Sequence, residues 1–178
     1  MKKQFTKFSE NIRLKESQET DAKTKYNGVC KTLHKSYYDN EYDGKTKLLF
    51  GSYRTKTNTR PLSENQDVDV IFKIPEATYN KFKNHNGNGP SALLQEIKNV
   101  LAKTYTTTER IKGWGKVVLV KFANNKHNIE VLPAFELEDK IGLGVTPTFS
   151  YNSHLQCEEV ENSFTLGAYA EYFIDDMY

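Results

Sequence analysis

Apolar residues recur along the chain with two different periods, which separates the expected helices from the expected strands. From about residue 17 to residue 38 they are spaced three and four apart, which predicts a helix with one buried face. That face consists of Ala22, Tyr26, Val29, Cys30, Leu33 and Tyr37. A second helix is expected after Ser91, a candidate N-cap, with Leu94, Ile97 and Leu101 on one side.

Alternation of apolar and polar residues predicts the strands. Residues 67–74 alternate cleanly, with Val68 and Val70 on one face and Asp67 and Asp69 on the other. Residues 47–50 form a short apolar run, and residues 116–123 and 127–135 predict two strands of a hairpin joined by residues 124–126. The order helix, strand, strand, helix, strand, strand predicts an α+β fold, a mixed β-sheet backed by helices.

The clear periodicity ends near residue 140, which divides the chain into two expected parts. Residues 1–140 form the expected core, and residues 141–178 form an atypical tail without convincing periodicity. A chain of 178 residues with 37% hydrophobic and 12% aromatic content is long and apolar enough for one packed domain.

The net charge of +2 is too small for a general nucleic-acid surface, so nucleic acid is not an expected partner. Four lysines of the first helix fall mostly off its apolar face, and the favoured interpretation is a solvated surface rather than a phosphate site. These are Lys23, Lys25, Lys31 and Lys35.

Several features predict a soluble cytoplasmic protein. Cys30 and Cys157 lie far apart and form no metal-type pair, so reduced thiols are the simpler interpretation. No apolar stretch follows the charged first residues as a secretory leader requires. No apolar run approaches the roughly 18 residues that a membrane-spanning helix needs.

The paired acids Asp67 and Asp69 are the strongest chemical signal. Side chains two apart in a strand point the same way and lie about 6.5–7 Å apart along it. Their carboxylates can converge on two cations spaced about 3.5–4 Å apart. Hard oxygen ligands of this kind suit Mg²⁺. The alternative is an edge strand that displays both acids to water.

Two further patterns strengthen this interpretation. Gly51 and Ser52 directly follow an apolar strand, where a glycine allows a tight turn close to a phosphate and the serine hydroxyl can bind the same group. Glu130 interrupts the apolar strand around Ile129 and Val131, and it can act as a third metal ligand. The alternatives are an ordinary turn and a solvent-facing acid on a hairpin.

Two other residues are weaker candidates. His127, beside the strand of Glu130, is expected to be an ordinary hairpin histidine, with contact to a phosphate as the alternative. Trp114 lies between two glycines and is expected to be a packing anchor, with stacking on a base as the alternative.

In combination, these patterns resemble the DNA-polymerase-β-type nucleotidyltransferase superfamily. More narrowly, the chain resembles the bacterial cGAS/DncV-like nucleotidyltransferases (CD-NTases), which make cyclic oligonucleotide signals in anti-phage defence. The resemblance covers roughly residues 5 to 138 and includes the segments 49–53, 67–72, 113–118 and 130–135. It implies a polymerase-β-type catalytic core in residues 1–140, without the helical C-terminal half that family members usually have.

The resemblance implies a template-independent enzyme that joins nucleoside triphosphates into a cyclic di- or trinucleotide and releases pyrophosphate. Asp67, Asp69 and Glu130 would hold two Mg²⁺ ions, with Mn²⁺ as the alternative, and the product would alert a downstream effector protein. Glu130 stands where the family more usually has aspartate.

The resemblance also implies that Gly51, Ser52, Lys56 and Thr57 bind the triphosphate. The family commonly has a glycine where Lys56 stands, and a lysine there either clashes with the loop or contacts phosphate. Other interpretations remain open: nucleotide transfer to a protein, an RNA or a small molecule, a truncated nucleotide-binding module without turnover, or a degenerate gene product.

Overall fold

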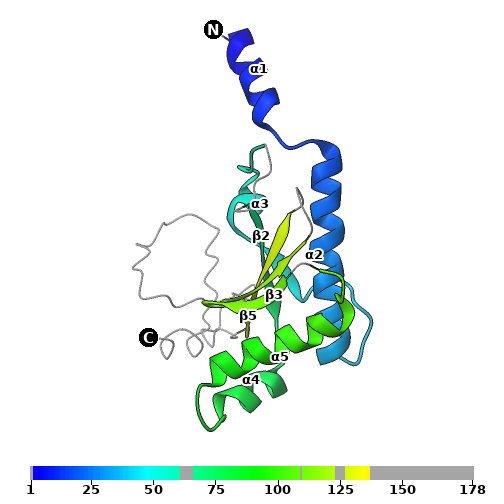
Figure 1. Ribbon diagram of the computed structural model, residues 1–178, viewed down its shortest axis with the longest axis vertical. Helices are drawn as coiled ribbons and strands as arrows, with labels where there is room; N and C mark the ends of the chain where they lie inside the picture. The colour runs from blue at the N-terminus through cyan, green and yellow to red at the C-terminus, as the bar shows by residue number, and fades with distance from the viewer. Residues whose placement is uncertain (1, 61–65, 109, 123–126, 137–178) are drawn as a thin grey trace, which may run out of the picture.

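The computed structural model describes residues 2–60, 66–108, 110–122 and 127–136 (Figure 1). Helices and strands alternate irregularly along the chain, as expected for an α+β protein. In order they are α1 Lys2–Ile12, α2 Glu16–Tyr37, β1 Lys47–Leu49, α3 Gly51–Thr55, β2 Asp67–Lys73, α4 Glu76–Lys83, α5 Gly89–Thr104, β3 Arg110–Trp114, β4 Val117–Lys121 and β5 Asn128–Ala134.

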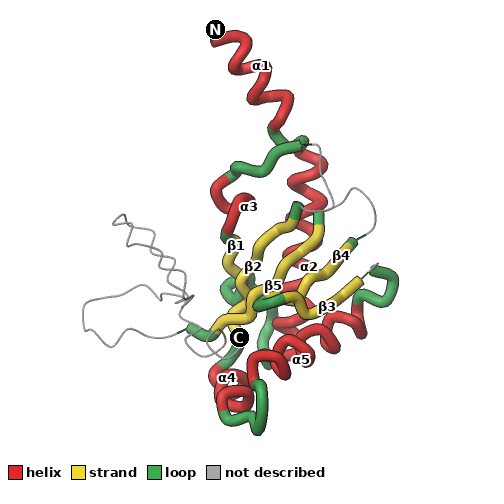
Figure 2. The backbone as a smooth tube through the Cα atoms, turned by 60° about the vertical axis from the view of Figure 1, so that its left-hand side comes forward, coloured by secondary structure: helices red, strands yellow, loops and turns green. Residues whose placement is uncertain are grey.

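The five strands form one mixed sheet in the order β1-β2-β5-β4-β3 (Figure 2). Strands β2 and β5 are parallel, whereas the pairs β1–β2, β4–β5 and β3–β4 are antiparallel. This confirms the predicted α+β class and the antiparallel pairing of the last two strands. The parallel pair at the centre joins two segments that lie far apart in the sequence.

Helices α2 and α5 cover one face of the sheet (Figure 2). The alternation in β2 points Val68, Val70 and Phe72 toward these helices, and all three side chains are completely buried. A smaller apolar cluster of Ile71, Leu132 and Ala134 is buried separately from this core. The opposite face of β2 therefore carries both apolar and acidic positions.

The predicted helical face of α2 is confirmed. Ala22, Tyr26, Val29, Cys30 and Leu33 are all buried, and Tyr37 packs half-buried against the same core. Cys30 is a free thiol whose pKa is raised to about 12 by burial. Cys157 lies outside the described residues.

Several local predictions need correction. Helix α5 begins at Gly89, and its N-cap is Asn88, whose side chain accepts a hydrogen bond of 2.8 Å from the Ser91 amide. Ser91 is thus inside the helix and is not its cap. Trp114 is 59% exposed and cannot be a packing anchor; the Lys112 ammonium instead lies 3.4 Å from its ring centroid.

Four elements were not in the order predicted from the sequence: α1, α3, α4 and β3. Helix α1 extends away from the rest of the domain and exposes Phe5 and Phe8 (Figure 1). Strand β3 has no clean alternation of buried and exposed positions, so its sequence pattern does not predict a strand. In the structure its antiparallel pairing with β4 defines it. Among the helices of the described ranges, none is long and apolar enough to cross a membrane. The predicted 124–126 turn and the 141–178 tail lie outside the described residues.

Candidate active site

Strand β2 places Asp67 and Asp69 on the sheet face away from α2 and α5. Their neighbours Val68 and Val70 are fully buried in the core, whereas both acids are half-buried. The strand period of two requires this separation, because each acid directly precedes a valine that faces the helices. The two carboxylates therefore share one face of the sheet, as predicted.

The parallel register of β2 and β5 brings the third acid to the same place. Glu130 is the direct partner of Asp69, and Asn128 is the direct partner of Asp67. Directly paired residues of neighbouring strands lie side by side on one face. We call Asp67, Asp69, Asn128 and Glu130 the polar patch.

Asn128 was not singled out by the sequence-based reasoning. It is 3% exposed and stands two residues before Glu130, so it faces the same way. The spacing rule that paired Asp67 with Asp69 would have found it. Its amide adds a neutral donor and acceptor beside the three carboxylates.

Burial and neighbouring negative charge raise the pKa values of two acids of the polar patch, Asp69 and Glu130. Burial, followed by the charge of Asp67, raises the pKa of Asp69 above its usual range. Burial, followed by the charges of Asp67 and Asp69, likewise raises the pKa of Glu130. The Oδ1 atom of Asp67 is buried and has no hydrogen-bond partner in the part of the chain that the structure describes. Within the described ranges, no ion pair neutralises any of these three acids.

Gly51 allows the chain to turn directly against the polar patch. Its φ is +61°, in the left-handed region, and a β-carbon there would lie 2.2 Å from Asp69 Oδ2. The Phe50 amide donates a hydrogen bond of 3.2 Å to the Asp69 carbonyl, which fixes the distance between the turn and β2. Any other residue at this position would adopt a strained backbone angle and would have to displace the Asp69 carboxylate.

The predicted phosphate loop follows as α3 and its C-terminal turn. Ser52 is exposed, and its hydroxyl oxygen accepts a hydrogen bond of 3.1 Å from Asn58 Nδ2. The Thr57 amide donates to the Ser52 carbonyl at 3.0 Å, and the Thr57 and Thr55 hydroxyls lie 2.9 Å apart. Because α3 has only five residues, a helix dipole adds little to this loop.

Lys56 occupies the left-handed conformation that explains the glycine expected at this position. Its φ is 57°, and Lys56 is the only non-glycine residue with a positive φ in the described part of the chain. A β-carbon in this conformation costs roughly 1–2 kcal/mol. Lys56 therefore keeps the turn of the loop at the cost of backbone strain, and its contact with phosphate stays a prediction. The side chain is exposed and lines a cavity beside α2.

The polar patch suits a divalent cation in its donor chemistry. It offers carboxylate oxygens on adjacent strands, and the mutual repulsion of the acids would fall on binding of a cation. Within the residues described, no group of three or more His, Cys, Asp or Glu side chains is already arranged around a metal position. Mg²⁺ usually takes one or two carboxylates together with substrate phosphates, so a closed protein cage is not required.

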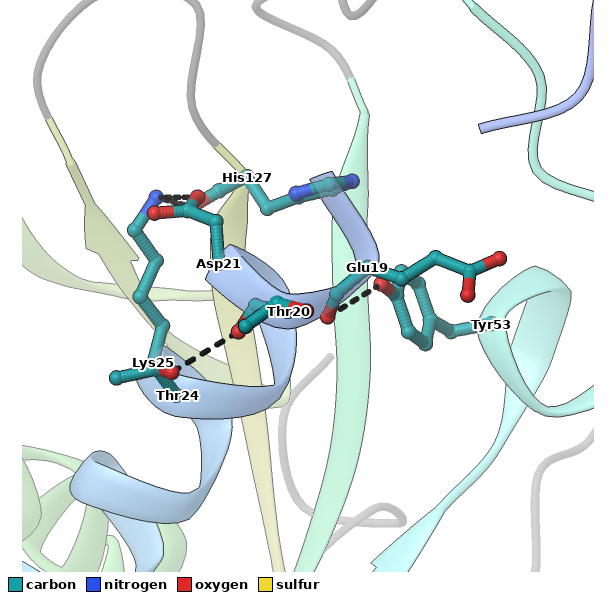
Figure 3. A network of polar contacts seen from close by, with 7 residues as sticks. All are labelled: Glu19, Thr20, Asp21, Thr24, Lys25, Tyr53 and His127. Atoms are coloured by element: carbon teal, nitrogen blue, oxygen red, sulfur yellow. Dashed lines mark hydrogen bonds and ion pairs between the residues drawn. The ribbon is translucent and has the colours of Figure 1, made fainter. Parts of the chain in front are cut away.

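His127 lies on the other side of the sheet from the polar patch. It is 1% exposed, and its ring packs edge-on against Tyr53 with centroids 5.6 Å apart. Neither ring nitrogen has a hydrogen-bond partner among the described residues, and burial lowers the pKa of the imidazole. Figure 3 shows the ring between α2 and Tyr53, with the Lys25 ammonium donating to the His127 carbonyl at 3.4 Å. The side chain is a buried contact of α2.

The chain belongs to the SMODS family, the Second Messenger Oligonucleotide or Dinucleotide Synthetase domain, which matches residues 1–170. This family match confirms the resemblance to the cyclic oligonucleotide class of nucleotidyltransferases. The match also extends beyond the boundary expected near residue 140. No curated protein matches the chain.

Solved structures of CD-NTases share the fold. The CdnC:HORMA-deltaN complex of E. coli MS115-1 matches with a TM-score of 0.54 and 17% identity, over 78% of this chain and 42% of that chain. CdnG of Bradyrhizobium diazoefficiens in complex with GTP matches with a TM-score of 0.50 and 16% identity, over 73% and 36%. The CdnE cyclic dinucleotide synthase of Elizabethkingia meningoseptica has a TM-score of 0.47 and 24% identity, over 67% and 39%. The chain therefore spans between 36% and 42% of the length of these structures.

Proposed function

We propose that the chain carries the catalytic core of a metal-dependent, template-independent nucleotidyltransferase. It joins nucleoside triphosphates into a di- or trinucleotide, cyclic in its final form, and releases pyrophosphate. The observation that carries the proposal is the register of β2 and β5, in which Glu130 is paired with Asp69 and Asp67 lies two residues away on the same face. Membership of the SMODS family supports the same reaction class.

In the proposed site, Asp67, Asp69 and Glu130 would hold two Mg²⁺ ions, with Mn²⁺ as the alternative. The bound ions would neutralise the phosphates and make the attacking hydroxyl more acidic. Asn128 lies beside Asp67 in the register of the two strands. Residues 1–140 form the core that contains these groups, and residues 141–178 are an atypical extension.

The triphosphate is proposed to bind at the turn that follows β1. Gly51 brings the backbone against Asp69, so a phosphate on this turn is also next to the acids. The hydroxyls of Ser52 and Thr57 donate hydrogen bonds to the phosphate oxygens, and Lys56 adds positive charge at the end of the same loop. Exposure of all four residues supports this assignment.

The reaction is an in-line substitution at the α-phosphorus. A 2′- or 3′-hydroxyl oxygen of one nucleotide forms the new P–O bond, and the bond to pyrophosphate breaks. The hydroxyl proton passes to a carboxylate of the polar patch, for which Glu130 is the proposed acceptor. A second substitution closes the ring, and the product alerts an effector protein in the cytoplasm.

The complex of CdnG with GTP supports nucleoside triphosphates as the substrate class. The decisive experiment incubates the purified chain with Mg²⁺ or Mn²⁺ and four α-labelled triphosphates, alongside the Asp67→Asn variant. A phosphatase-resistant product made by the wild type alone is expected, and its mass would identify it. Label on a protein or RNA would point to a different acceptor.

Retained turnover in folded Asp67→Asn protein would overturn the proposed role of the acids. Metal-dependent triphosphate binding without any product would instead assign the chain as a nucleotide-binding module. Binding is measured for both proteins by equilibrium dialysis with each metal, so that the two results can be separated.

A further inference from the structure

A cavity lies beside α3, formed by residues that do not belong to the polar patch. Its volume is about 530 Å³, and its walls come from the α1–α2 connection, from α2 and from the segment 53–58. A cavity of this volume is within the range that holds small ligands. None of Asp67, Asp69 and Glu130 lines it.

Positive charge predominates in this cavity. Arg13, Lys23 and Lys56 line it together with one carboxylate, that of Glu19. In the described part of the chain none of these three cations forms an ion pair. Lys25, one turn further along α2 from Asp21, is by contrast bonded to that acid at 2.6 Å. Three unpaired cations around one space attract an anion.

Two tyrosines add aromatic rings to the cavity wall. Tyr26 is buried, and Tyr53 packs edge-on against it with ring centroids 6.3 Å apart. The Tyr53 hydroxyl donates to the Glu19 carbonyl at 3.5 Å, which links α3 to the start of α2 (Figure 3). Aromatic rings of this kind can contact the planar group of a ligand whose charged part lies on the cations.

The outer wall is held by contacts between segments that are distant in the sequence. Arg60 donates from its backbone amide to the Ile12 carbonyl at 2.7 Å and from Nε to the Asn11 carbonyl at 2.5 Å. Arg13 and Thr59 form an isolated β-bridge. These contacts position Arg13 across the cavity from α2, so the arrangement of cations does not depend on a bound ligand.

We propose that this cavity is an anion site that binds a phosphorylated ligand. It is separate from the polar patch, which is the proposed site for cations. The phosphates contact Arg13 and Lys23, with Lys56 shared between the cavity and the loop that begins at Ser52. Asn58 lines the cavity and donates to the Ser52 hydroxyl oxygen. A ligand in the cavity would therefore lie next to the proposed triphosphate loop.

The test measures anion binding by the full chain in EDTA, where metal-dependent binding at the polar patch is absent. ATP and tripolyphosphate are titrated by calorimetry into the wild type and into Lys23→Gln and Arg13→Gln. Each substitution is expected to weaken binding by about tenfold, the usual effect of losing one charge-assisted hydrogen bond. Lys31→Gln, on an exposed position of the same helix, is the matched control and should bind like the wild type.

Asp69→Asn separates the two sites, because it should leave binding in EDTA unchanged while it removes metal-dependent binding. Tighter binding of ATP than of tripolyphosphate would show that the tyrosines contact the base, and equal binding would assign the site to phosphates alone. The proposal is overturned if neither anion binds, if both cavity variants bind like the wild type, or if Asp69→Asn loses binding in EDTA. Those results would leave the catalytic proposal standing, since it depends on turnover with metal.

Discussion

The backbone of Gly51 lies so close to Asp69 that a β-carbon would stand 2.2 Å from the carboxylate oxygen Oδ2. This contact joins the end of β1 to the acidic face of β2. It places the proposed phosphate-binding turn directly beside a proposed metal ligand. A substitution at Gly51 should therefore disturb the site more than the fold.

We expect Gly51→Ala to displace the Asp69 side chain and to abolish metal-dependent nucleotide binding. Gly115→Ala is the matched control, because Gly115 has a similar φ of +58° with nothing within 4 Å of an added β-carbon. Both variants should lose roughly 1–2 kcal/mol of stability, since both place a β-carbon in the left-handed region. Urea denaturation measures stability, and dialysis with labelled triphosphate measures binding. Equal binding by the two variants would contradict the proposed role of this contact.

We expect Asp69→Asn to stabilise the metal-free protein at neutral pH. The folded-state pKa of Asp69 is raised by burial and by Asp67, so wild-type stability falls as pH rises from the unfolded value, about 3.9, through the folded value. Asp69→Asn has no carboxylate at this position, so its stability does not fall in this pH range. Its melting temperature in EDTA should exceed that of the wild type by a few degrees at pH 7.5. The difference should shrink as the pH approaches 4.

Asp43→Asn provides the opposite control, because hydrogen bonds to Lys45 lower the pKa of the exposed Asp43. Its substitution should give no gain in stability at pH 7.5. Addition of Mg²⁺ should raise the melting temperature of the wild type and leave that of Asp69→Asn unchanged. A lower melting temperature for Asp69→Asn in EDTA at pH 7.5 would refute the account of repulsion in the polar patch.

We expect Lys56→Gly to stabilise the protein by about 0.5–1 kcal/mol. Glycine relieves the left-handed strain at φ 57°, although its freedom in the unfolded chain offsets part of the gain. Lys56→Ala removes the same charge and keeps the strain, so it should not stabilise. Urea midpoints of the two variants distinguish a backbone effect from an effect of charge. Stabilisation by Lys56→Ala of the same size would attribute the effect to charge.

We expect Glu130→Gln to lower turnover on the order of a hundredfold or more, because it removes a proposed metal-binding charge. Glu130→Asp should retain more activity, since it keeps the charge and shortens the side chain by one methylene. Glu130→Asp should melt close to the wild type. Glu130→Gln should melt somewhat higher in EDTA at pH 7.5, because burial and the charges of Asp67 and Asp69 raise the pKa of Glu130 as they raise that of Asp69. The rate of pyrophosphate release is measured for the wild type, Glu130→Gln and Glu130→Asp. Equal rates for Gln and Asp at this position would argue against a charged ligand.

The sequence alone determined the features that depend on local periodicity. Spacing of three and four defined the buried face of α2, and strict alternation separated Val68 and Val70 from the acids of β2. Both patterns follow from backbone geometry within one element. The same rule applied to β5 would have added Asn128 to the candidate site.

Tertiary structure decided what depends on pairing between distant segments. The parallel register that sets Glu130 beside Asp69 joins strands separated by two helices and two other strands, so no local pattern encodes it. Packing of the turn against β2 decided that position 51 must be glycine, and the end of α3 placed Lys56 in a left-handed conformation. Side-chain periodicity reports which face of an element is buried, whereas only the folded sheet determines which faces meet.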